Sequence, residues 1–296
     1  MIAAPLPLPS STAPRLVACA DLLAVLAADY EEAWEARQAG QSRGPVTGFR
    51  GLDAELGGHL AVGVHAMHGS PGAGKTAWAL QIAATCGSPS LFVSVEMGAE
   101  ELFRRLTARV TGTYLGKLRG AELPPAEALA LFRRTAAACP DLVIADATTS
   151  PATPEWLTTS LMVVRRTSAH ALVVVDSVHS WASSLTTAEL GEYESLNCAM
   201  ADLRALAEER RAAVLITVER NRASMQSGGQ HAGAGTRRLD YAPASVLELT
   251  READALPDAS GEVAVTLKIS KNRNGCAGRT YGLRFHGALQ RFTPAP

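Results

Sequence analysis

The stretch GSPGAGKT, from Gly69 to Thr76, constrains the fold of this 296-residue chain more than any other feature. It matches the pattern G-x-x-x-x-G-K-[ST] at every fixed position, after a β-like apolar run and before a helical one. In such a loop, backbone N–H groups cradle phosphates, Lys75 can reach the β- and γ-phosphates, and Thr76 can ligate Mg²⁺. The alternative is a glycine-rich turn that matches the pattern by chance. A chance match would not be expected to lie between a strand-like run and a helical run, as this one does. The residues predicted to bind the nucleotide are Gly69, Ser70, Pro71, Gly72, Ala73, Gly74, Lys75 and Thr76.

Short apolar runs and helical stretches alternate around this motif. Five runs are almost continuously apolar, at 61–68, 90–96, 142–146, 171–177 and 212–219. The stretches between them are helical in pattern, at 75–85, 98–110, 125–138, 153–168 and 192–211. Apolar strands that alternate with helices are typical of a parallel sheet covered on both faces.

After residue 240 the helical pattern stops. Three strand-like runs, at 244–252, 261–273 and 279–287, predict an antiparallel extension. The last two flank Asn274-Gly275, a dipeptide that favours tight hairpins. The predicted fold class is therefore α/β, with a mainly parallel sheet, helices on both faces and a C-terminal antiparallel hairpin.

Two cations lie just before that dipeptide. Lys271 and Arg273 are two residues apart, so they share one face of the predicted strand. From the residues alone, they are either part of a solvated edge or two charges aimed at a ligand.

The first 45 residues are predicted to be separate from the rest. Residues 1 to about 14 are rich in Pro, Ser and Ala, which predicts disorder. A helix is predicted at about 16–38, with a rough apolar stripe at Leu16, Leu22, Leu23, Leu26 and Trp34. This helix has no domain of its own to pack into, so we expect it to dock elsewhere. One domain is predicted over 46–296.

The composition indicates where in the cell the protein is found but does not indicate its binding partner. The 28 basic and 29 acidic residues give a net charge of −1, so the whole-chain charge neither favours nor excludes nucleic acid. The five cysteines form no CxxC pair and are odd in number, which is typical of a reduced intracellular protein. The start lacks the pattern of a signal peptide, and no apolar run approaches the ~18 residues of a membrane span. A cytoplasmic location without membrane contact is expected.

Two carboxylates are candidates for the chemistry of a triphosphate. Asp176 ends an apolar strand, and a carboxylate at that edge of a parallel sheet faces the ligand crevice. A strand-end Asp that only caps a loop is the alternative. Glu96 follows another apolar strand and is the better candidate for the base that orients water for attack.

At this point seven segments, in order from about residue 46 to the end, resemble a known family. They resemble the C-terminal ATPase domain of hexameric replicative helicases of the DnaB type, a branch of the RecA-like P-loop ATPases. LFVSVEMGAEELFRRL resembles the family's SLEMSAEQL motif, HALVVVDSVHSW its LIVIDYLQL segment and SKNRNG its AKQRNG segment. The others are TGFRGLDAELGG, the P-loop segment GSPGAGKTAWALQIA, PDLVIADATTSPATPEW and AVLITVERNRAS.

The resemblance implies a RecA-like fold, ATP and Mg²⁺ as cofactors, and roles for the matched residues. Lys75 and Thr76 would bind phosphate and magnesium, Asp176 would hold the magnesium shell, and Glu96 would activate water.

The resemblance also implies that the chain acts as a ring, with a hexamer expected. Lys271 and Arg273 would act in trans, reaching the γ-phosphate bound to the neighbouring subunit. Such an arginine finger stabilises the transition state of phosphoryl transfer and contributes about 10³-fold or more in rate.

The sequence also departs from the family. Glu219 occupies the position of a glutamine that senses the γ-phosphate, and a carboxylate there repels phosphate unless a cation or a proton compensates. The N-terminal collar domain of the replicative helicases is not represented in the sequence. The helix at about 16–38 resembles the linker helix that packs on a neighbouring subunit.

In a ring of this type, inner loops hold single-stranded DNA. The candidate is the glycine-containing stretch after Glu219, whose arginines can follow a phosphate backbone: Arg220, Arg222, Arg237 and Arg238. A solvated loop without a ligand is the alternative. The stretch SWASSLTTAELGEYES, which has no basic residue, is a weaker candidate for a second loop.

Two functions fit these features. The first is an ATP-driven, ring-forming helicase or translocase on single-stranded DNA, with a loader or other partner protein. The second is a RecA-like, ATP-switched assembly factor or regulator that binds DNA or a protein without unwinding. A recombinase-like filament or a circadian-type ATPase shares the fold but fits the VSVEM and KNRNG segments less well.

Overall fold

The computed structural model describes residues 17–186, 191–219, 242–252 and 256–295. It divides into two compact units, Met1–Arg43 and Gly44–Pro296, which are described separately.

The first unit contains one helical segment. A short 3-10 helix, η1 (Cys19–Leu22), leads into α1 (Leu23–Gln38). Neither element has a buried residue, and their large apolar side chains are exposed: Leu22, Leu23, Val25, Leu26, Tyr30 and Trp34. Leu16 of the predicted stripe lies outside the described residues. Helical apolar side chains that stay exposed mark a candidate interaction surface.

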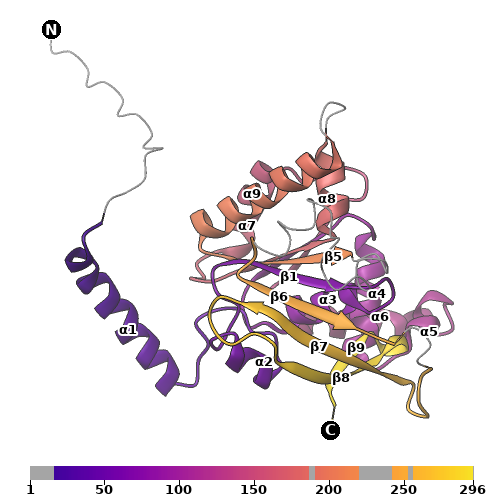
Figure 1. Cartoon of the computed structure of the whole chain (residues 1–296). Helices are drawn as coiled ribbons and strands as arrows, with labels where there is room; N and C mark the ends of the chain where they lie inside the picture. The colour runs from indigo at the N-terminus through magenta and orange to yellow at the C-terminus, as the bar shows by residue number, and fades with distance from the viewer. Residues whose placement is uncertain (1–16, 187–190, 220–241, 253–255, 296) are drawn as a thin grey trace. The chain divides into compact units, whose positions relative to one another are not determined.

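The second unit is built on a sheet that has nine strands over the described residues, in the order β3-β2-β4-β5-β1-β6-β7-β8-β9. Strands β5, β1, β6 and β7 follow one another in Figure 1. The first six in this order run parallel. Their bounds are β1 Gly63–Gly69, β2 Ser90–Ser94, β3 Leu142–Asp146, β4 Leu172–Asp176, β5 Ala213–Glu219 and β6 Ser245–Thr250. The remaining three are antiparallel: β7 Glu262–Asn272, β8 Thr280–His286 and β9 Arg291–Pro294.

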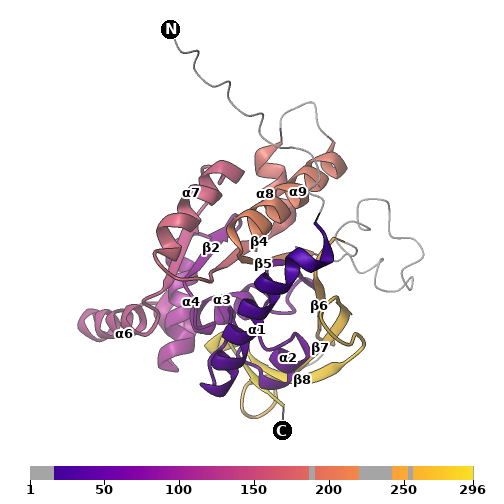
Figure 2. The ribbon, with the colours of Figure 1, turned by 90° about the vertical axis from the view of Figure 1, so that its left-hand side faces the viewer.

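Helices cover both faces of the parallel strands (Figures 1 and 2). Alternate residues of each strand point to opposite faces, so Leu215 joins the core around α3, whereas Val214 and Ile216 join the core around α7–α9. The helices are α2 Arg50–Glu55, α3 Lys75–Thr85, α4 Ala99–Thr111, α5 Leu115–Arg119, α6 Pro125–Ala138, α7 Pro154–Arg165, α8 Val178–Leu185 and α9 Glu192–Arg210, with a 3-10 helix, η2, at Gly287–Leu289. No described helix has the length and apolar character needed to cross a lipid bilayer.

The predicted fold class is confirmed, with differences in the pairing of one strand, in one further strand and in one predicted loop. The strand predicted to open the antiparallel extension, β6, pairs antiparallel with β7 as expected, but it also pairs parallel with β1 and so joins the two parts of the sheet. Strand β9 was not predicted, because four residues are too few to show a period. The stretch expected to form the weaker DNA loop is in part helical, since Ser180–Leu185 lies in α8.

The C-terminal hairpin differs from the predicted tight turn. The regular pairing of β7 with β8 ends at Lys268 and Thr280. Ile269 still exchanges backbone hydrogen bonds with Arg279 and Gly278, and residues 273–279 connect the strands. Asn274-Gly275 therefore does not form a two-residue turn, and Gly275 lacks the positive φ that such a turn requires. The end of β7 is held elsewhere: Lys271 pairs with Val246 of β6 beyond a bulge, and the Asn272 side chain donates to the Glu55 carbonyl at 2.6 Å.

Candidate nucleotide-binding site

The P-loop joins the end of β1 to the start of α3. Gly72 and Gly74 have φ values of 78° and 94°, in the left-handed region that side chains other than glycine rarely adopt. Gly74 is also confined by space, because a Cβ atom there would lie 2.7 Å from Cζ of Phe292. The loop therefore needs glycine for two reasons: the positive φ values at Gly72 and Gly74, and the close approach of Phe292 from β9 to Gly74.

Lys75 is the first residue of α3 and points back over the loop. Its ammonium donates to the carbonyl oxygens of Gly69 at 2.8 Å and Ser70 at 3.2 Å. Burial lowers the pKa of Lys75, and the carboxylates of Glu219, Asp176 and Glu96 oppose this shift. The cation is therefore held at the loop by backbone oxygens and surrounded by acidic groups.

Asp176 ends β4 and is almost fully buried. Its Oδ1 accepts a hydrogen bond from the Thr217 hydroxyl at 2.5 Å. Burial raises the pKa of Asp176, while the Thr217 and Thr76 hydroxyls and the Lys75 charge lower it. Thr76 and Asp176 line the same cavity, and Mg²⁺ favours hard oxygen ligands of this kind together with phosphate oxygens and water. These two residues therefore fit a magnesium ion, although the described residues contain no cluster of three or more His, Cys, Asp or Glu for a metal.

Glu96 lies beyond the end of its strand, since β2 stops at Ser94. Two hydroxyls hold its carboxylate: Ser177 Oγ and Ser180 Oγ each donate to Oε1 at 2.5 Å. Ser177 is also the N-cap of α8 and accepts from the Ser180 N–H. The start of α8 therefore fixes the orientation of the candidate base.

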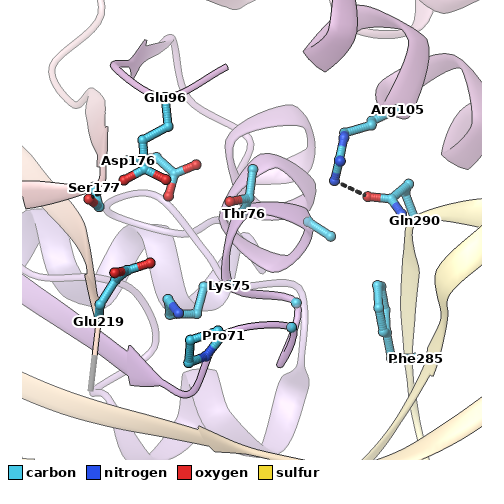
Figure 3. A pocket seen from close by; sticks show the side chains of 13 residues that line it. Pro71, Lys75, Thr76, Glu96, Arg105, Asp176, Ser177, Glu219, Phe285 and Gln290 are labelled. Carbon is cyan, nitrogen blue, oxygen red and sulfur yellow. Dashed lines mark hydrogen bonds between the residues drawn. The ribbon is translucent and has the colours of Figure 1, made fainter. Parts of the chain in front are cut away.

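These groups converge on a cavity of about 310 Å³ (Figure 3). Its far side is formed by three residues that the sequence did not suggest: Arg105 of α4, Phe285 of β8 and Gln290. Arg105 donates to Gln290 Oε1 at 2.8 Å and to Glu101 Oε1 at 2.9 Å. These two contacts hold the Arg105 guanidinium in the cavity, so the chain that carries the P-loop also supplies an arginine to it.

Glu219 lines this cavity, but the two predicted fingers do not. Glu219 ends β5, and in the pairing of β5 with β1 its Cα lies opposite that of Gly69. Lys271 pairs with Val246 near the start of β6, whereas Gly69 pairs with Leu249 further along the same strand. Lys271 and the exposed Arg273 thus lie toward the end of the parallel strands that is opposite to the P-loop.

The arginines predicted to contact DNA cannot be placed. Arg220, Arg222, Arg237 and Arg238 all lie outside the described residues.

Comparison with models of known protein families shows to which family the chain belongs. The model of the DnaB-like helicase C terminal domain matches residues 44–294. The chain belongs to the DnaB-like helicase C-terminal domain family. No curated protein gave a match to this DnaB-like chain.

Solved structures agree with the fold of this DnaB-like domain. The ATPase domain of G40P matches with a TM-score of 0.77 and 19% identity, over 93% of this chain and 99% of that one. A DnaB-like replicative helicase, described with its interactions with primase, matches with a TM-score of 0.75 and 19% identity, over 94% of this chain and 70% of that one. A KaiC-like protein from Pyrococcus horikoshii OT3 matches with a TM-score of 0.58 and 16% identity, over 85% and 98% of the two chains. At these identities the likeness establishes the fold, which is RecA-like.

The serine contacts in this DnaB-like site lead to a prediction. We expect the double substitution Ser177→Ala and Ser180→Ala to lower the turnover number for ATP by roughly 10- to 100-fold, because a hydrogen bond to a charged group is worth about 1.5–3 kcal/mol. The affinity for ATP should stay within about threefold, since the serines hold Glu96 and not the phosphates. Steady-state hydrolysis and equilibrium nucleotide binding measure the two effects separately.

Ser184→Ala is the matched control for that experiment. Ser184 lies on the same helix, but its hydroxyl donates to the Trp181 carbonyl and does not contact Glu96. A double variant that loses ATP affinity as much as turnover would show that the serines serve the fold of the pocket instead of the base.

Proposed function

We propose that this chain hydrolyses ATP in a ring of identical subunits, with six as the expected number, and moves along single-stranded DNA as a helicase. The observation that carries the proposal is the convergence of Lys75, Thr76, Asp176 and Glu96 on one cavity. These residues come from elements that are far apart in the sequence. Together they supply a cation, a pair of metal ligands and a base, which are the groups that phosphoryl transfer to water requires.

Each group would have a defined task in that reaction. The P-loop N–H groups and the Lys75 ammonium would bind the phosphates and stabilise the charge that develops on them. Glu96, fixed by two serine hydroxyls, would orient a water molecule for in-line attack and accept its proton. Thr76 and Asp176 would hold Mg²⁺, which when bound neutralises charge on the phosphate oxygens.

The positions of Lys271 and Arg273 support action on a neighbour. They lie toward the end of the parallel strands away from their own P-loop, so they cannot complete the site of their own chain. A head-to-tail ring brings one edge of a subunit against a different edge of the next. The exposed apolar side chains of α1 would supply further packing area for this assembly.

Nucleic acid and protein partners are further parts of the proposal. The arginines that follow Glu219 would track the DNA backbone through charge and not through base stacking, since the stretch contains no aromatic residue before Tyr241. A solved DnaB-like helicase is described with its interactions with primase, and a loader or another partner protein is proposed here by analogy.

A second function is favoured by one observation, the carboxylate of Glu219 in the cavity. A charged side chain at this position would alter how the γ-phosphate is coupled to movement. The chain would then act as an ATP-switched assembly factor or regulator that binds DNA or a protein without unwinding.

Strand displacement decides between the two functions. With a forked DNA duplex that carries a fluorophore and a quencher, we expect the chain to release the labelled strand only when ATP and Mg²⁺ are present. Lys75→Ala protein should release none. ATP hydrolysis and ATP-dependent binding of single strands, without any release, would reject the helicase and favour the switch. Mass measurements with and without ATP and single-stranded DNA would report the ring size.

A further inference from the structure

The fold places Glu219 at the phosphate end of the cavity. It is the last residue of β5, and its Cα lies opposite that of Gly69, where the P-loop begins. Alternate residues of a strand share a face, so Glu219 is on the same face as Thr217, whose hydroxyl donates to Asp176 at 2.5 Å. Leu215, two residues earlier still, packs in the core around α3. Glu219 is therefore on the face of the sheet that carries the P-loop helix and the candidate magnesium ligand.

The charges around this position are unbalanced. Three carboxylates and two cations line the cavity: Glu96, Asp176, Glu219, Lys75 and Arg105. In Figure 3 the Glu219 carboxylate points toward the region of Lys75 and Asp176. Of the acidic groups that hold up the pKa of Lys75 against burial, Glu219 has the largest effect. Glu219 thus attracts the same ammonium that a bound γ-phosphate would use.

We propose that Glu219 determines the nucleotide specificity of this pocket by repelling a γ-phosphate whose charge is not neutralised by a divalent cation. This inference rests on the proposed ATPase function. An ionised carboxylate is an acceptor only, so it cannot donate a hydrogen bond to a phosphate oxygen, and it adds a like charge. The pocket would admit a nucleoside triphosphate as its Mg²⁺ complex and penalise the free triphosphate. ADP, which has no phosphate at that position, would be affected far less.

The isosteric substitution Glu219→Gln tests the inference. The affinities of the hydrolysis-resistant analogue AMP-PNP and of ADP are measured by calorimetry in excess Mg²⁺ and in excess EDTA. We expect Glu219→Gln to bind AMP-PNP in EDTA at least about tenfold more tightly than the wild type. The substitution removes the repulsion between the Glu219 carboxylate and the γ-phosphate, and at an effective dielectric constant of about 20 two charges a few ångströms apart change the affinity by at least this factor. In Mg²⁺ the gain for AMP-PNP should be smaller. The affinity for ADP should change by less than about threefold in both buffers.

Glu192→Gln is the matched control, because it removes the same charge from the first turn of α9, outside the cavity lining. It should leave all four affinities unchanged. Equal tightening of AMP-PNP and ADP, or no change for either, would overturn the role of Glu219. Failure of the wild-type chain to bind AMP-PNP even in Mg²⁺ would instead reject the proposed function, and with it this inference.

Discussion

Lys75→Ala should reduce ATP hydrolysis by on the order of 10²–10³-fold or more, because a preorganised cationic donor at the developing charge has an effect of at least this size. The substitution removes the P-loop ammonium and leaves three carboxylates in the cavity against the single guanidinium of Arg105. Without the ammonium the excess of negative charge in the cavity lining grows, so the pocket would repel a triphosphate more strongly than in the wild type. Nucleotide affinity should therefore fall together with turnover, a pattern distinct from that of the serine substitutions.

The fold should survive this change. Burial lowers the pKa of Lys75, so its charge is in part a cost to the folded chain, and its ammonium donates to the carbonyls of Gly69 and Ser70 within the loop itself. Phosphate release, nucleotide binding and the thermal unfolding midpoint should be measured on the same preparation.

Lys117→Ala is the control for the first prediction. Lys117 is an exposed lysine of α5 and does not line the cavity. Turnover by Lys75→Ala protein at the rate of the wild type, with this control also active, would show that the nucleotide is hydrolysed elsewhere.

The regular elements were predictable because they rest on local patterns. The helices at 75–85 and 125–138 have the predicted bounds. Apolar strands and glycine-dependent turns are likewise encoded within a few residues. The choice of partner strand is not local, which is why the parallel pairing of β6 was missed.

The site was predictable only where a motif names its residues. The P-loop, Asp176 and Glu96 each follow a strand in a recognisable pattern, whereas the groups that position them come from distant segments. Ser180 contacts Glu96 across 84 positions, and Arg105 contacts Gln290 across 185. Nothing in the local sequence separates Arg105 from its neighbour Arg104, which is half-buried and does not line the cavity. Such contacts depend on the tertiary packing of α4, α8 and the C-terminal strands.

Arg273→Ala should leave ATP binding intact and lower hydrolysis by about 10³-fold or more, the contribution expected of an arginine finger supplied in trans. The reason is the position of Arg273, which follows β7. Its N–H donates to the carbonyl of Ala244, the residue before β6, at 2.9 Å, and this holds it toward the end of the parallel strands away from the P-loop. The exposed side chain lies outside the lining of its own cavity, so its loss should not weaken the nucleotide contacts of its own chain. Phosphate release and equilibrium binding of an ATP analogue measure the two effects.

Arg279→Ala is the matched control for this variant. Arg279 lies in the same connection and pairs with Glu55 at 3.1 Å at an exposed site, where an ion pair contributes about 0–1 kcal/mol. It should hydrolyse ATP at nearly the wild-type rate. A loss of activity in both variants would point to disruption of the connection and not to a finger.

Mixing two inactive proteins tests whether the finger acts between subunits. An Arg273→Ala subunit keeps its P-loop and a Lys75→Ala subunit keeps its finger, so an intact site forms wherever the second presents its finger to the first. In a randomly mixed head-to-tail ring, at most about a quarter of the interfaces have this order, and activity should peak near equal amounts. Exchange of labelled subunits, followed by energy transfer, verifies that the rings mix. Complete mixing without any recovered hydrolysis would contradict action in trans, whereas recovery that follows the product of the two fractions requires that each ATP is hydrolysed at the boundary of two chains.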